Sequence, residues 1–261
     1  MVSEYLKQNK QIVELDALYA ANLSAAASVT ALLMSQQFSM AISSITEITQ
    51  IANARIQADC TVASARIESN SQVCVTEIAA KAEMAMLKIQ TLEAHEMLSQ
   101  EQIGSMVDQI GYAARQEISM SAANSIELIK TQAESSLKEI ANHTNSSIDK
   151  IRSMAEVTAE QTSKDAKLAK TKLDESKKYE RTGEEIKEEA EKAIQLVLDF
   201  NSETTLKLRD KASTAIKELN SLSNGLLSEI SDVVAMSEGF ILSRRDEALV
   251  RIDNLIKHKQ L

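Results

Sequence analysis

The histidines are the first residues of this chain to test for chemistry, because one of them opens a metal-binding pattern. His95-Glu96-Met97-Leu98-Ser99 begins like the HExxH motif of zinc proteases, in which two histidines four residues apart on a helix bind the metal. Ser99 stands where the second histidine is needed. The other two histidines, His143 and His258, lie too far along a helical chain to replace it. The sequence therefore predicts no metal site.

Catalytic motifs are also missing from the sequence. No glycine-rich loop could hold a phosphate, and no GxSxG turn could present a nucleophilic serine. Carboxylates are scattered along the chain, and a serine on a helix usually bonds a backbone carbonyl of its own helix. We therefore expect no enzymatic activity, no catalytic residue and no bound cofactor.

The two cysteines, Cys60 and Cys74, are predicted to be unpaired. On one helix their separation corresponds to about 21 Å of rise, which is beyond the reach of a disulfide. Unpaired cysteines are typical of a reducing cytoplasm. Crosslinks between subunits through these cysteines are the alternative.

The composition favours helices that run without interruption. The 261 residues include no proline and only five glycines, and one proline inside a helix would cost about 3 kcal/mol. Aromatic residues make up 3 % of the chain, so a loop-rich α/β or all-β domain with a conventional core is excluded. The net charge of −9 leaves no basic face for a nucleic acid.

Apolar residues recur at a spacing of eleven. Eleven residues complete three helical turns, so such a hendecad column stays near-straight along the helix or drifts into a right-handed supercoil. The columns cover about half of the helix circumference, which is wider than the seam of a two-stranded coiled coil. We therefore expect them to pack between subunits. The predicted assembly interface consists of Met34, Met40, Ala41, Ile45, Ile51, Ala52, Ile56, Val62, Ala63, Ile67, Val73, Ile78, Met84, Ile89, Ile118, Ile129, Ile140, Ile151, Val197, Leu208, Leu219, Ile230, Ile241 and Ile252.

These columns predict an all-α fold of one or two very long helices in a bundle or polymer, without a compact globular domain. Residues 1–16 form a polar N-terminal segment. Residues 17–160 are expected to be one long helix rich in Ala, Ser and Ile, which is the assembly core. Residues 161–192 are a highly charged helical segment, and residues 193–261 a second hendecad helix.

The continuity of the first helix depends on its phase. Ile89 and Val107 are separated by 18 residues, which is five turns at 3.6 residues per turn, so the apolar face stays aligned between them. A break, kink or hairpin is expected near 181–183 instead. There Thr182-Gly183-Glu184-Glu185 has the spacing of a capping box.

The segment 17–46 is long enough to span a bilayer and contains no charged residue. Its many alanines and serines give little insertion energy, so we expect a helix buried among other protein helices, with a transmembrane span as the alternative. Because the N-terminus is polar, we expect no secretory signal. The expected location is the cytoplasm.

A stretch near the N-terminus resembles the R-body (killing-trait) structural proteins, which build coiled bacterial ribbons. The resemblance covers about 40 residues and is carried by Leu18-Tyr19, Ala25-Ala26-Ala27 and Gln36-Gln37. The asparagine that precedes the glutamine run in that family is absent here. The resemblance implies polymerisation into a contractile ribbon.

The sequence thus favours a structural protein that assembles with itself, or with related helical subunits, into a filament, ribbon, tube or sheet. A helix lying on a lipid surface is one alternative, because eleven-residue repeats also suit it. The net charge of −9 and the few bulky anchors argue against that alternative. A desiccation-type protein of the late-embryogenesis class is the other alternative, although such chains are much more hydrophilic.

Overall fold

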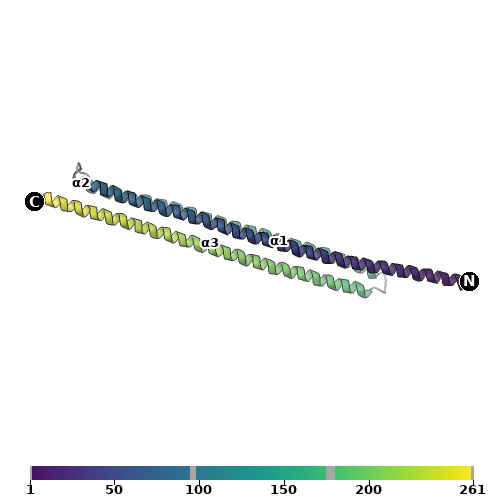
Figure 1. The fold of residues 1–261 in the computed structure, drawn as a ribbon. Coiled ribbons are helices and arrows are strands. Elements are labelled where there is room, and N and C mark those ends of the chain that lie inside the picture. Colours follow the sequence, from purple (N-terminus) through teal and green to yellow (C-terminus); the bar gives the residue numbers. More distant parts are fainter. Residues whose placement is uncertain (1, 95–97, 175–179, 260–261) are drawn as a thin grey trace. The chain divides into compact units, whose positions relative to one another are not determined.

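The computed structural model is built from three long α-helices (Figure 1). It describes residues 2–94, 98–174 and 180–259, and the side chains of residue 25 and of residues 27–94, 98–174 and 182–257. The helices are α1 (Val2–Glu93), α2 (Gln100–Asp174) and α3 (Glu180–Lys259), and the described residues contain no strand. The all-α prediction is confirmed, and the helices pack as a bundle. Three helices stand where one or two were expected.

The chain divides into two units, each built from a part of every helix. Unit 1 consists of residues 1–56 and 142–212, and unit 2 of residues 57–141 and 213–261. Each unit has a buried core of its own, formed within the chain. In unit 1 this core includes Ala27, Met34, Ala166, Ala169, Leu173, Ile186 and Ala190. In unit 2 it includes Ile89, Ile103, Val107, Ala248 and Ile252.

Within each unit α2 runs antiparallel to α1. In unit 1 the Gln37 side-chain amide donates a hydrogen bond to Asp165 at 3.2 Å. In the same unit, Ile48 further along α1 lines a hollow with Asn142, which lies earlier along α2. Helix α3 returns antiparallel to α2, so it runs parallel to α1.

The buried core follows the spacing of eleven in all three helices. On each helix a column of large residues lies beside a column of small ones. On α1 the buried column Met34, Ile45, Ile56, Ile67, Ile78 and Ile89 accompanies Ala41, Ala52, Ala63, Cys74 and Ala85. On α2 Val107, Ile118, Ile129, Ile140 and Ile151 accompany Ala122, Ala133, Thr144, Ala155 and Ala166. On α3 Ile186, Val197, Leu208, Leu219, Ile230, Ile241 and Ile252 accompany Thr204, Ala215, Ser237 and Ala248.

The prediction of one helix over 17–160 is wrong, because α1 ends at Glu93 and α2 begins at Gln100. The cause is a capping box at the start of α2. The Ser99 hydroxyl accepts a hydrogen bond from the backbone N–H of Gln102 at 3.2 Å, and the Gln102 side chain accepts one from the N–H of Ser99 at 3.0 Å. This reciprocal pair satisfies two N–H groups that a new helix would otherwise leave open.

The other predicted boundaries also shift. Residues 2–16 belong to α1 and form no separate segment. The charged segment 161–192 is divided between the end of α2 and the start of α3. The prediction of a break near 181–183 is wrong, because these residues belong to α3. Helix α2 ends at Asp174, and α3 begins at Glu180. The residues between these ends, 175–179, lie outside the described part.

No helix in the described part of the chain combines the length and the apolar character that crossing a bilayer would require.

Replacing Ser99 with alanine tests the capping box. We expect Ser99→Ala to lower the free energy of unfolding by about 1 kcal/mol, the usual loss for a helix N-cap, as measured by urea denaturation followed by circular dichroism. The control is Ser135→Ala, which alters an exposed serine inside α2 and should leave stability unchanged or slightly raised. Equal losses in both variants would contradict this role for Ser99.

Candidate assembly interface

The structure divides the predicted interface residues into two groups. Most of them, including every isoleucine of the column Ile45 to Ile89, are buried inside the chain. They form the core of the two units and are not available to a second subunit in this fold. The exposed group is Met40, Ile51, Val62, Val73 and Met84.

The exposed residues form one column on α1, which Val29 extends by one further repeat. The six residues are spaced by eleven, and each keeps between 49 % and 69 % of its surface accessible. Val29, Met40 and Ile51 lie in unit 1, and Val62, Val73 and Met84 in unit 2. We call these six residues the outer column. Sequence reasoning omitted Val29, although its distance of eleven from Met40 was sufficient to find it.

The outer column lies at the edge of α1 that is next to α2. At about 98° per residue, Gln37 is roughly 65° round the helix from Met40, and Gln37 contacts Asp165 of α2. The same position in unit 2 is occupied by Asn70, whose amide donates to Gln132 of α2 at 2.6 Å. The buried isoleucine column lies about 131° from the outer column, toward the core.

In unit 1 three hollows follow the line where α1 meets α2, and together we call them the α1/α2 groove. Their volumes are about 190 Å³, 290 Å³ and 910 Å³. The walls carry the apolar side chains of Leu33, Met40 and Ile48 from α1, and of Met154, Val157 and Leu168 from α2. Met40, Val157 and Leu168 are more than half exposed. Asp149, Lys150, Asp165 and Lys172 of α2 also line the hollows, so the groove is an open trough with apolar side chains from both helices and charged ones from α2.

The outward side of α1 carries no charge between residue 25 and residue 46, and the first exposed charge beyond this stretch is Glu47. From residue 25 to residue 46 its exposed side chains are Ala, Ser, Val, Leu, Gln and Met. The neighbouring helices differ. On α2, Glu160 pairs with Lys164 at 2.6 Å, and this contact lowers the pKa of the Glu160 carboxyl. On α3, Lys187 and Glu191 lie 3.7 Å apart.

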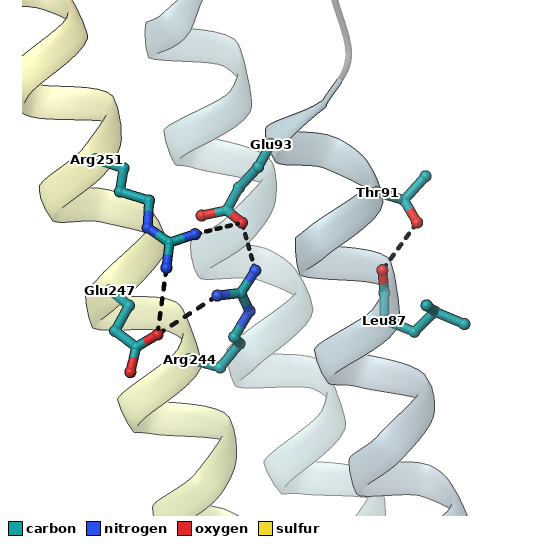
Figure 2. A network of polar contacts seen from close by, with 6 residues as sticks. All are labelled: Leu87, Thr91, Glu93, Arg244, Glu247 and Arg251. Carbon is teal, nitrogen blue, oxygen red and sulfur yellow. Dashed lines mark hydrogen bonds and ion pairs between the residues drawn. The ribbon is translucent and has the colours of Figure 1, made fainter.

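A partly buried ionic cluster joins α1 to α3 in unit 2 (Figure 2). Glu93, the last residue of α1, accepts contacts from Arg244 at 2.5 Å and Arg251 at 3.5 Å. Glu247 lies 3.4 Å from Arg244 and 3.7 Å from Arg251. The side chains of Glu93 and Arg244 are 15 % and 19 % exposed, so this pair is shielded from water far more than the pairs along single helices.

The cysteines and histidines were the other residues considered for chemistry, as crosslinks between subunits or as metal ligands. Cys60 and Cys74 are both buried, so a crosslink between subunits would require the fold to open. The Cys60 thiol approaches the Ala215 carbonyl at 3.8 Å, and burial, with a smaller effect of Glu218, raises its pKa. Within the described residues no three His, Cys, Asp or Glu side chains meet in a way that could hold a metal. His95 and the side chain of His258 lie outside the described part.

No protein-family model and no curated protein matches the chain. Among solved structures it is similar to a computationally designed three-helix bundle, at 15 % identity and a TM-score of 0.43. The match covers 92 % of this chain and 99 % of that one.

Removing the charge of Glu93 should destabilise unit 2. Because Glu93→Gln leaves Arg244 partly buried beside a neutral partner, we expect a loss of about 1–3 kcal/mol in the free energy of unfolding, measured by urea denaturation. Glu203→Gln is the control, since Glu203 pairs with Lys207 on the exposed surface of α3 and should change stability little. A loss no larger than that of the control would show that the cluster does not stabilise unit 2.

Proposed function

We propose that this protein is a structural subunit, whose long helices assemble side by side with other copies into a filament, ribbon, tube or sheet. One observation carries the proposal. The outer column is a row of large apolar side chains on α1 that the folded chain leaves exposed. Single exposed apolar residues are ordinary, whereas six of them recur here at one spacing along one helix, and in unit 1 Met40 lies beside further apolar side chains of the α1/α2 groove.

The spacing of the outer column favours a helical partner. A column that repeats every eleven residues stays on one side of a straight helix, so it presents a continuous line to another rod. The supercoil predicted from this period, and the contractile ribbon implied by the R-body resemblance, are forms that such an assembly would take. Related helical subunits with the same period would fit as well as identical copies.

The chemistry of the surface favours protein over lipid as the partner. Helices that lie on membranes usually carry lysines beside the apolar face and bulky anchors within it. The outward side of α1 between residues 25 and 46 has no lysine and no aromatic residue among its exposed side chains. The net charge of −9 also opposes binding to an anionic surface.

Charged substitutions in the outer column should prevent assembly. We expect the double variant Ile51→Lys, Val62→Lys to sediment as a monomer at concentrations at which the unaltered protein sediments as larger species. Two lysine charges placed in the row would have to be buried without partners. Analytical ultracentrifugation with negative-stain microscopy measures the difference.

The matched control is Leu206→Lys, which alters an equally exposed residue on α3, away from the outer column. This variant should retain the contact made through α1 and sediment faster than a monomer. If the unaltered protein is itself a monomer or a uniform dimer at high concentration, the proposed function is wrong.

A further inference from the structure

We propose that two copies pair through α1, with the two α1 helices parallel and in register, and with each α1 seated in the α1/α2 groove of the other copy. The inference rests on the proposed function and specifies the contact by which two copies begin to assemble. The occupant of the groove is therefore the outer side of α1 from a second copy of this chain.

The size of the groove suits a helix. Its three hollows follow α1 from Ala27 to Ile48, a rise of about 31 Å at 1.5 Å per residue. A further helix that contacts both α1 and α2 must lie roughly 60° round α1 from α2, because three helices at a common packing distance form an equilateral triangle. That direction passes over Leu33 and Met40, which are two of the α1 residues that line the hollows.

The outer column lies beside the groove along α1. In unit 1 it consists of Val29, Met40 and Ile51, which span a rise of about 33 Å. No other exposed apolar residues of the described chain recur at a single spacing over so many turns.

The distribution of charge also favours the outer side of α1 as the contact between two copies. Two chains that each carry −9 repel one another, and the repulsion is least where the facing surfaces are uncharged. The exposed side chains of α1 from residue 25 to residue 46 meet this condition. The exposed surface of α3 in unit 1, with Glu184, Glu188 and Glu191, would instead face a second copy with like charges.

The orientation follows from reciprocal seating. If each α1 contacts both helices of the opposite groove, each α2 lies at equal distances from the two α1 helices. A two-fold axis perpendicular to the helices would then place the two α2 helices on the same position. A two-fold axis parallel to the helices places them on opposite sides of the α1 pair. Only the second arrangement avoids the clash, and it makes the α1 helices parallel.

Parallel pairing gives a distinctive result, because each residue of the outer column approaches the same residue of the other copy. We would replace Met40 with cysteine and treat the full chain with a short bis-maleimide. The native cysteines are buried, so the unaltered chain is the blank. Crosslinked dimer should form at least about tenfold faster for Met40→Cys than for the control Leu196→Cys, because pairing holds two thiols at a millimolar effective concentration.

A mixture of two variants tests the orientation. In the parallel pair, Val29→Cys and Ile51→Cys, which both lie in unit 1, each crosslink to their own kind and form no mixed product. Formation of the mixed 29–51 product would show antiparallel pairing and overturn the inference. Co-flotation of the chain with phosphatidylserine vesicles, together with no crosslink at position 40, would also overturn it by assigning the groove to lipid.

The proposed function and this inference fail in different ways. A protein that sediments only as a monomer contradicts both. A protein that forms large assemblies, but shows no faster crosslinking at position 40 than at position 196, contradicts the parallel pair alone. Circular dichroism of each cysteine variant confirms that the helices are intact, so that a missing crosslink is not the result of unfolding.

Discussion

The fold depends on the placement of large side chains beside small ones at the same spacing in all three helices. Each buried isoleucine or leucine contributes about 1.5–3 kcal/mol relative to an exposed one, but only if the neighbouring helix can approach. The accompanying Ala, Ser and Thr columns allow this approach, as with Ala52 beside Ile45 and Ile56 on α1. Large residues in both columns would overfill the space between helices.

The same constraint leaves one apolar column of α1 uncovered. In each unit α1 has two neighbours, α2 and α3, and these cover the side that carries the isoleucine and alanine columns. The outer column lies about 131° from the isoleucine column, at the edge of α1 next to α2, where α2 covers its residues only in part. A chain of three helices therefore buries the core columns of α1 and leaves a third column exposed, which is the surface that the proposed assembly would use.

Much of the fold could be predicted from the sequence, but the positions of the helix ends could not. The absence of proline and the columns predicted an all-α fold, which is confirmed, but most of the column residues are buried inside the chain and not between subunits. The end of α1 at Glu93 was missed because Ile89 and Val107 stay in phase, so the apolar pattern shows no interruption between them. Ser99 and Gln102 have the S-x-x-Q spacing of a capping box, but the break was predicted at the similar pattern of Thr182 and Glu185 instead.

The candidate site shows a different limit of sequence reasoning. Periodicity identifies which residues of a helix are apolar, but not which of them the other helices of the chain will cover. Met40 and Ile45 belong to columns of equal regularity in the sequence, yet one is 69 % exposed and the other fully buried. The difference depends on the directions from which α2 and α3 approach α1, and these are set by contacts between distant residues.

Polar contacts between distant residues also determine the register of the helices. The apolar columns alone do not determine it. A helix that slides by eleven residues, about 16 Å, places every column on an equivalent column, so apolar packing distinguishes the two registers only weakly. The polar contacts are not repeated in this way. A slip would separate Gln37 from Asp165 in unit 1, and Glu93 from Arg244 in unit 2. Polar groups inside coiled coils specify register at some cost in stability, and these pairs distinguish the observed register from its shifted equivalents.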